Sequence, residues 1–220
     1  MIFDVDGTLY RQAPVRRGTA FRFLCYALRH PAPALRAAAF LREYRRAQEQ
    51  LRAVGSGPDQ LRVACESTGT EYAKAMAYVQ CWLEGRPLDL VAKAIYPGLV
   101  PFLSKATERG IKLAVVSDYP AEEKLRALGL DAFFCAVISA SGPSGRRFKP
   151  APDGILAVLE ELAVAPSHAI YVGDRPDVDA AAAKAAGTAC AILGYPPNPD
   201  PGGWLGAPDY FRLASLLGLN

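Results

Sequence analysis

Cysteine, histidine and net charge are all scarce in this sequence, and it has no long apolar run. The 220 residues include five cysteines, an odd number without a C-x-x-C pair, which excludes a disulfide-stapled scaffold and favours buried free thiols in a reducing compartment. No stretch approaches the ~18 consecutive apolar residues of a membrane-spanning helix, and Met1 leads directly into Ile2-Phe3-Asp4 rather than into a signal segment. We therefore expect a cytoplasmic protein with no membrane partner.

Two further absences narrow the chemistry. His30 and His168 are too few and too far apart in the sequence to indicate a zinc site. No glycine-rich loop of the P-loop type is present, which argues against nucleotide-driven kinase chemistry. The chain is 51% hydrophobic and 21% charged, so it is too apolar to be disordered and long enough to bury one substantial core.

The small net charge of +3 hides an asymmetry along the chain. From Arg11 to Val54 there are ten arginines, no lysine and only two acids, so this stretch carries +8. Residues 11–95 together carry +7 and the rest of the chain −4. We interpret most of these arginines as solvated helix faces, in particular Arg42, Arg45, Arg46 and Arg52. Nucleic-acid binding is not expected, because the segment has no recognisable reading motif.

The hydrophobic periodicity changes near Tyr96-Pro97-Gly98. Before this point apolar residues recur at helical spacing, in the stripes Phe21, Leu24, Cys25, Leu28 and Leu41, Tyr44, Ala47, Leu51. Breaks at 30–33, 55–58 and 68–71 divide residues 18–95 into four or five helices. Thr68 and Glu71 have the spacing of a capping box at a helix start.

After Gly98 short apolar runs alternate with amphipathic segments. We expect a first strand at 2–5 and others at 111–116, 133–138, 169–172 and 189–193, with helices at 99–109, 121–128, 151–162 and 177–186, and a final loop, short strand and helix in 194–220. This alternation is typical of a parallel sheet covered on both faces. It predicts an α/β fold in which residues 1–10 and 96–220 form a Rossmann-like three-layer core. Residues 11–95 form a small all-helical domain inserted after the first strand.

Acidic residues follow the expected strands at the edge where ligands bind in open α/β sheets. Asp4 and Asp6 flank one valine, so in extended backbone both carboxylates can face one site. Asp174 follows another strand, and Asp177 and Asp179 lie just behind it. Several acids in one crevice repel one another unless a hard cation lies among them, and Mg²⁺ prefers oxygen ligands. The sequence therefore predicts a magnesium site.

Four ordered motifs resemble those of the haloacid dehalogenase (HAD) superfamily: D-V-D-G-T-L at 4–9, V-V-S-D at 115–118, F-K-P at 148–150 and V-G-D-R-P-D-V-D at 172–179. The resemblance covers nearly the whole chain. It is greatest to the subfamily IA members with a helical C1 cap between the first and second motifs, which include phosphoglycolate phosphatases and β-phosphoglucomutases. Residues 11–95 lie where that cap belongs.

The resemblance implies roles for the motif residues. Asp4 corresponds to the nucleophile that forms an aspartyl phosphate, and Asp6 to the general acid and base. Ser117 and Lys149 correspond to the groups that bind the phosphoryl oxygens, Lys149 being also a catalytic charge. Asp4, the backbone carbonyl of Asp6 and Asp174 correspond to the Mg²⁺ ligands, with the metal's waters oriented by Asp179.

Asp6 points to phosphorus chemistry, because an alkoxide leaving group needs a proton and a halide does not. The leading prediction is a Mg²⁺-dependent, phosphoglycolate phosphatase-like hydrolase of a small phosphate monoester. The alternative is a phosphomutase of the β-phosphoglucomutase type, and a non-catalytic binding protein is a third interpretation. We expect a monomer or homodimer whose partner is a small phosphorylated substrate. Arginine suits anionic groups, so we predict substrate contacts from the segment that joins cap and core, at Arg11, Arg16 or Arg17.

Overall fold

The structure is a computed structural model that describes residues 1–54, 59–141, 146–197 and 203–219. The expected break at 55–58 and part of the expected loop after Gly194 lie outside the described residues. Every helix in the described ranges is too short or too polar to cross a membrane. All five cysteines are free thiols, as predicted, but of these only Cys190 is buried, because Cys135 is exposed and the other three are half-buried.

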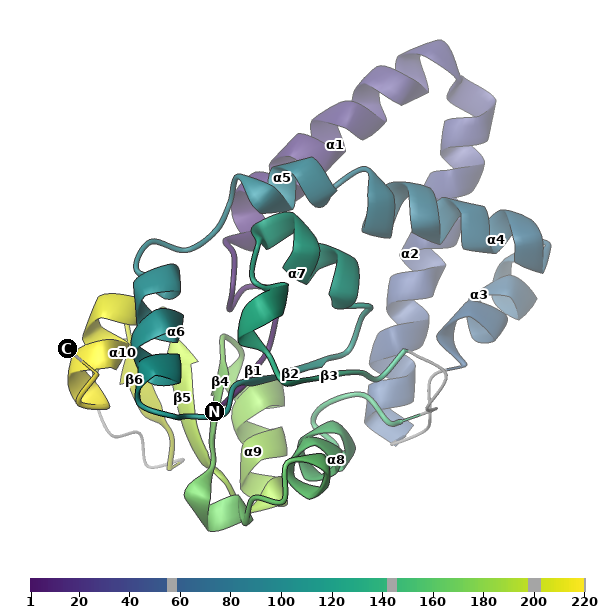
Figure 1. Cartoon of the computed structure of the whole chain (residues 1–220). Coiled ribbons are helices and arrows are strands. Elements are labelled where there is room, and N and C mark those ends of the chain that lie inside the picture. Colours follow the sequence, from purple (N-terminus) through teal and green to yellow (C-terminus); the bar gives the residue numbers. More distant parts are fainter. Residues whose placement is uncertain (55–58, 142–145, 198–202, 220) are drawn as a thin grey trace.

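The described strands form one parallel sheet (Figure 1). Its order is β3-β2-β1-β4-β5-β6, and every neighbouring pair is parallel. The strands are β1 (Ile2–Phe3), β2 (Ala114–Ser117), β3 (Ala136–Ser139), β4 (Ile170–Gly173), β5 (Ala189–Leu193) and β6 (Leu205–Ala207). The predicted α/β fold with a parallel sheet is confirmed, including the short strand near the end of the chain.

Helices cover both faces of the sheet, giving three layers (Figure 1). One face packs against α6 (Leu99–Glu108), α7 (Glu122–Leu128) and α10 (Tyr210–Leu216), and the other against α8 (Asp153–Glu161) and α9 (Ala181–Ala186). The alternation of side chains along a strand divides the core accordingly, since Phe3 belongs to the first layer and Ile2 to the second. This is the predicted three-layer core.

Two predicted strands start too early. The apolar runs at 111–116 and 133–138 enter the ladder only at Ala114 and Ala136. Leu113 is buried although it precedes the strand, and 131–133 form a 3₁₀ turn. An apolar run indicates that a segment is buried. Where its strand begins depends on where a neighbouring strand is available for backbone hydrogen bonds. Similarly, the helix expected at 177–186 begins with a π-helical turn, Pro176–Ala180, before α9.

The described residues from Gln12 to Ala92 are mainly helical, as predicted. They form α1 (Gln12–Arg29), α2 (Pro31–Val54), α3 (Gln60–Thr68), α4 (Tyr72–Val79), a π-helical turn (Gln80–Gly85) and α5 (Leu88–Ala92). Helix α1 begins six residues earlier than the expected 18, with Pro14 in its first turn, where proline is tolerated. The predicted capping box is wrong: Thr68 is the last residue of α3, and its hydroxyl donates to the carbonyl of Ala64 at 2.7 Å.

The two predicted apolar stripes differ in how far they are buried. In α2, Tyr44, Ala47 and Leu51 are buried. In α1, by contrast, Phe21 and Leu28 are 67% and 78% exposed, so this stripe is not a core face. Helix α1 packs instead through its other side, where Phe23 lies edge-on to Trp82 with ring centroids 4.7 Å apart. Periodicity predicts a helix with an apolar face but not which face its neighbours cover.

Candidate active site

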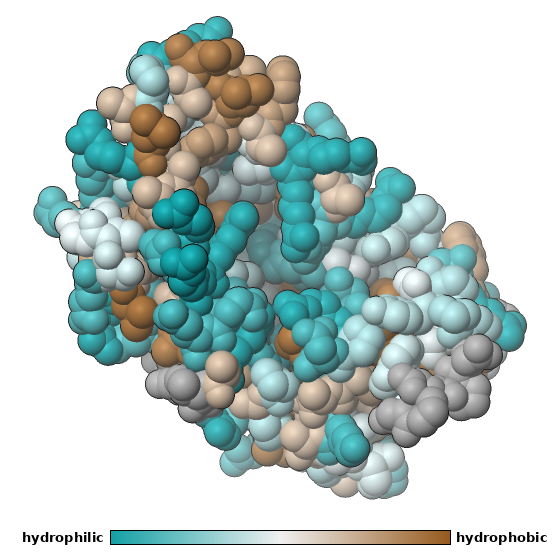
Figure 2. Space-filling model, turned by 180° about the vertical axis from the view of Figure 1, so that it is seen from behind, coloured by the Kyte–Doolittle hydropathy of each residue, from teal (hydrophilic) through white to brown (hydrophobic). Residues whose placement is uncertain are grey.

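The carboxyl ends of the parallel strands meet a cleft of about 1130 Å³ beneath the helices of residues 11–95. Figure 2 shows this cleft as a hollow bordered by hydrophilic side chains. The six site residues predicted from the motifs all line it: Asp4, Asp6, Ser117, Lys149, Asp174 and Asp179. The topology therefore brings together motifs that are up to 175 residues apart in the chain, from Asp4 to Asp179.

A turn after β1 allows the first and fourth motifs to approach each other closely. Gly7 has φ +103°, and a Cβ added there would lie 2.1 Å from Oδ2 of Asp174. Only glycine fits both the backbone conformation and the space. In the same turn, the hydroxyl of Thr8 donates to Oδ2 of Asp4 at 3.2 Å, which orients the carboxylate.

Lys149 is the central cation of the cluster. Its Nζ donates to Oδ1 of Asp4 at 2.6 Å, to Oδ1 of Asp179 at 2.7 Å and to the hydroxyl of Tyr171 at 2.9 Å. Burial by itself would lower the pKa of Lys149, but Asp179 and Asp4 outweigh it and hold the pKa well above its usual value. Lys149 therefore stays charged throughout the physiological range.

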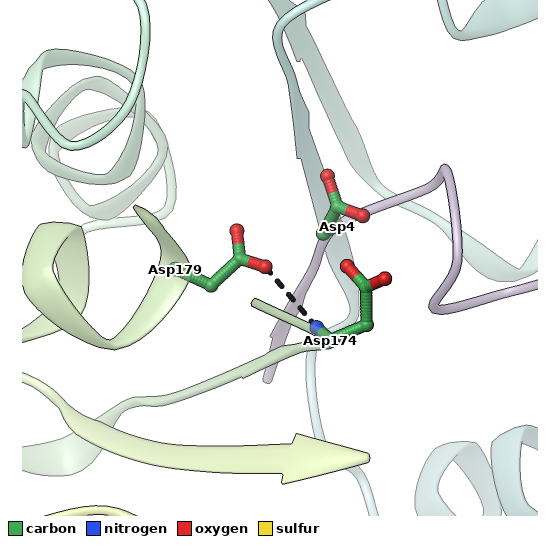
Figure 3. Close-up of side chains that lie close together, drawn as sticks. All are labelled: Asp4, Asp174 and Asp179. Atoms are coloured by element: carbon green, nitrogen blue, oxygen red, sulfur yellow. Dashed lines mark hydrogen bonds between the residues drawn. The ribbon is translucent and has the colours of Figure 1, made fainter. Parts of the chain in front are cut away.

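Three carboxylates stand around one point, as Figure 3 shows. Asp4, Asp174 and Asp179 each offer an oxygen within 4.8 Å of the others. The backbone N–H of Asp174 donates to Oδ2 of Asp179 at 3.1 Å, so the π-helical turn and the end of β4 are tied together. Burial raises the pKa of Asp174 to about 6, with Asp179 adding to the shift, and burial likewise raises the pKa of Asp4.

This donor set fits a hard divalent cation. All three ligand groups are carboxylates, whose oxygens Mg²⁺ prefers. Burial is the largest cause of the raised pKa values of Asp4 and Asp174, and neighbouring carboxylates add to both shifts, so a cation bound among them would favour their ionised forms. The backbone carbonyl of Asp6, the other predicted ligand, accepts a hydrogen bond from the side-chain amide of Gln12.

The carboxylate of Asp6 has different surroundings. Nζ of Lys124, on α7, lies 2.8 and 2.6 Å from its two oxygens, and the hydroxyl of Tyr10 donates to it as well. Burial by itself would raise the pKa of Asp6, but Lys124 and Tyr10 outweigh it and lower the pKa. Asp6 is therefore ionised, and it stands apart from the three-carboxylate cluster.

Ser117 lies at the end of β2, almost fully buried, and its Oγ accepts the backbone N–H of Tyr119 at 3.2 Å. The three arginines predicted to touch substrate are all exposed; Arg16 lines the cleft, and Arg11 and Arg17 do not belong to its lining. The backbone N–H of Arg11 donates to the carbonyl of Ala94 at 2.9 Å, so the two ends of the helical segment lie side by side.

The interpretation of Arg52 as a solvated residue is wrong. Its side chain is only 10% exposed and forms an ion pair with Asp118 in the cleft. Arg46, on the same helix, does extend into solvent as predicted, with 62% of its side chain exposed. Helical spacing placed Arg52 beside the buried stripe, but it gave no sign that the end of α2 lies against the loops that follow β2 and β3.

Sequence reasoning also missed Lys124 and Tyr171. Lys124 lies in an ordinary Glu-Glu-Lys run on a helix, and Tyr171 is one apolar-looking position in a buried strand. The sequence around Lys124 or Tyr171 does not indicate a site residue, because Lys124 contacts Asp6 and Tyr171 contacts Lys149 only in the folded protein.

Comparisons with known proteins agree with this arrangement. The haloacid dehalogenase-like hydrolase family model matches residues 1–187. The chain is 34% identical over 139 residues to a phosphoglycolate phosphatase of Rhodospirillum rubrum, a match that covers 60% of this chain and 56% of that protein. It is 30% identical over 202 residues to a phosphoglycolate phosphatase of Pseudomonas putida, covering 89% of this chain and 69% of that protein.

A solved structure has the same fold. The 2-haloacid dehalogenase of Pseudomonas syringae pv. tomato superposes with a TM-score of 0.68 at 23% identity, covering 99% of this chain and 96% of that one. The family match spans the first, second, third and fourth motifs and the cleft that they form. The chain therefore belongs to the haloacid dehalogenase-like hydrolase family.

Proposed function

We propose that the protein is a Mg²⁺-dependent phosphatase that hydrolyses a small organic phosphate monoester through an aspartyl phosphate. The observation that carries the proposal is that two carboxylates of one motif line one cleft and have pKa values shifted in opposite directions. Asp4 lies beside Lys149 in the three-carboxylate cluster, and Asp6 lies outside it. The names of the relatives from Rhodospirillum rubrum and Pseudomonas putida favour phosphoglycolate or a similar ester as substrate.

In the first step an oxygen of Asp4 attacks phosphorus, and the bond from phosphorus to the ester oxygen breaks. Lys149, 2.6 Å from Asp4, favours the ionised form of the nucleophile. Ser117 and Lys149 hold the phosphoryl oxygens, on which charge is spread in the transition state. The departing alkoxide takes a proton from Asp6, so Asp6 must be protonated and separated from Lys124 when substrate is bound.

In the second step the carboxylate of Asp6 takes a proton from water, whose oxygen attacks phosphorus; the bond from phosphorus to the Asp4 oxygen breaks, which releases inorganic phosphate and restores the Asp4 carboxylate. The ion pair with Lys124 holds Asp6 in the ionised form that this step requires. Asp4, Asp174 and the carbonyl of Asp6 would hold Mg²⁺, with Asp179 behind them. The metal ion would offset the repulsion between an anionic nucleophile and an anionic substrate.

We also propose that residues 11–95 form a separate cap domain over a core of residues 1–10 and 96–220. The two connections lie side by side: Tyr10 and Ile95 form a bridge, and the N–H of Tyr96 donates to the carbonyl of Leu9 at 3.2 Å. The apolar packing crosses this boundary, because Val15 and Val91 belong to the core cluster under the sheet's first face.

A screen of small phosphate esters with detection of inorganic phosphate tests the function. We expect phosphate release from at least one ester, loss of activity in chelator and its return with Mg²⁺. Full activity in chelator would contradict the metal site. Conversion of a sugar phosphate to its isomer, without steady phosphate release, would instead establish the phosphomutase.

A further inference from the structure

The C-terminal end of α2 reaches across the cleft and docks on the loops that carry the second and third motifs. Leu51 is buried against Ala140 and Phe148, the residue just before Lys149. One turn earlier, Gln48 accepts a hydrogen bond from the hydroxyl of Tyr119. A helix of the inserted segment therefore packs directly on the loops that carry the reacting groups.

Arg52 forms the polar part of this contact. Its Nη2 donates to Oδ2 of Asp118, and its Nη1 donates to Oε1 of Glu49 at 2.7 Å. The side chains of Arg52 and Asp118 are 10% and 7% exposed, so the pair is largely shielded from solvent. Such a pair is sensitive to the loss of either member, because removing one leaves the other as a buried charge.

The other oxygen of Asp118 supports Lys149. Oδ1 accepts the backbone N–H of Lys149 at 3.0 Å, in a buried hydrogen bond between residues 31 apart in the chain. The same lysine places its Nζ between Asp4 and Asp179. Asp118 is thus a bridge between a guanidinium of α2 and the main chain of the residue that holds the nucleophile.

We propose that Arg52 is a positioning residue for the reaction, acting through Asp118 to hold the Lys149 backbone in place. The inference rests on the proposed function, in which Lys149 orients Asp4 and the phosphoryl group. Without Arg52, the carboxylate of Asp118 has lost its main charge partner and turns toward water, which weakens its hold on the N–H of Lys149. The position of Lys149 among the reacting groups then depends on the docking of α2.

The test compares Arg52→Ala with Arg46→Ala as a matched control. Arg46 is on the same helix and also has an ion pair, to Glu43 at 3.0 Å, but it points into solvent. We expect Arg52→Ala to lower kcat by about 10- to 100-fold with KM changed less than about threefold, since small displacements of reacting groups are costly. Arg52→Lys should restore part of the loss, and Arg46→Ala should behave as the unaltered protein.

A double-substitution cycle identifies the route of the effect. Asp118→Asn retains an acceptor for the Lys149 N–H but removes the charge that Arg52 pairs with. We expect Arg52→Ala to have little further effect on kcat in the Asp118→Asn background, because both changes interrupt the same connection. Additive losses would overturn the proposed route, and a rise in KM with kcat unchanged would show that Arg52 binds substrate instead.

Hydrogen exchange gives a readout that does not need turnover. Exchange of the peptide that contains Lys149 should be faster in Arg52→Ala than in the unaltered protein or Arg46→Ala. If no phosphate ester is hydrolysed but exchange changes as expected, the proposed function fails and the coupling stands. Unchanged exchange in a folded Arg52→Ala protein overturns the inference. If that variant does not fold, Arg52→Lys and Asp118→Asn carry the same test.

Discussion

Asp4 and Asp6 are separated by one residue, yet their environments push their pKa values in opposite directions. Burial raises the pKa of Asp4, while Lys124 and Tyr10 outweigh burial at Asp6 and lower its pKa. Paired groups whose pKa values are pushed apart are typical of sites that divide nucleophile and acid–base roles between two carboxylates. At the scale of single residues, charge partners from distant elements differentiate two identical side chains.

Asp4→Asn should abolish turnover. The amide has nearly the same shape as the carboxylate but is not a nucleophile, so we expect kcat to fall by roughly 10³-fold or more while the fold is retained. Phosphate release and circular dichroism measure the two parts of this prediction. Thr8→Val, which removes only the hydroxyl that orients Asp4, serves as a milder comparison. Substantial turnover by Asp4→Asn would contradict the aspartyl-phosphate mechanism.

Asp174→Asn should stabilise the metal-free protein at neutral pH. The folded-state pKa of Asp174 is raised from 3.8 to about 6, so the native state favours the protonated form. Its favourable contribution is complete below the unfolded pKa and is lost as the pH rises through about 6. Removing the charge should therefore increase the free energy of unfolding by roughly 1–2 kcal/mol at pH 7.5, allowing for partial exposure, and by little at pH 3.5.

Thermal melting in chelator measures this difference. For a chain of this size the expected gain corresponds to a Tm increase of about 2–8 °C at pH 7.5. An equal Tm difference at both pH values would show that the effect does not come from titration of Asp174. In the presence of Mg²⁺ the advantage should shrink, because the unaltered protein gains stability by binding the ion and the variant lacks a ligand.

At the scale of elements, the turn after β1 determines whether the first and fourth motifs can meet. β1 is only two residues long, and the chain leaves it through Asp4-Val5-Asp6 and the left-handed Gly7. The space that a Cβ would need at Gly7 is occupied by the carboxylate of Asp174. The glycine is thus required by a contact with β4 as well as by the turn itself.

Gly7→Ala should damage both stability and activity. The strained φ and the 2.1 Å approach to Asp174 require the turn or the carboxylate to move, and we expect a loss of about 2 kcal/mol or more and a large fall in kcat. Gly110→Ala is the matched control, because Gly110 has φ +72° but nothing within 4 Å of the added Cβ. That variant should lose about 1 kcal/mol and keep its kinetics. Equal kinetics in the two variants would show that the contact with Asp174 is unimportant.

At the scale of the whole molecule, charge is divided between the helical segment and the sheet. Residues 11–95 carry +7 and the rest of the chain −4. Basic side chains from both parts line the cleft, including Arg16, Arg45, Arg52, Lys124 and Arg175. The helical segment contributes four basic and two acidic side chains to this lining, and the rest of the chain contributes three basic and five acidic ones, so attraction of a phosphate ester should come from the helical side of the cleft.

The proposed phosphatase should therefore depend on ionic strength. Between about 50 mM and about 500 mM salt we expect KM for a phosphate monoester to rise several-fold while kcat changes little, because screening weakens attraction more than contact chemistry. Arg16→Ala should raise KM at low salt and reduce the salt dependence, whereas exposed Arg17, outside the cleft lining, should not matter. A KM that does not respond to salt would contradict electrostatic attraction of substrate.

The sequence by itself determined the α/β class, the parallel sheet, the helical insertion and the motif residues. Apolar runs, helical spacing and D-x-D-G-T are local patterns, and each reflects a local physical requirement. Only the tertiary structure decided which helix faces are covered and which basic side chains reach the site. The stripe of Phe21 and Leu28 is exposed, while Arg52 is enclosed. Lys124, Tyr171 and Asp118 acquire their partners through contacts with residues 22 to 118 positions away in the chain, and sequence spacing carries no record of such contacts.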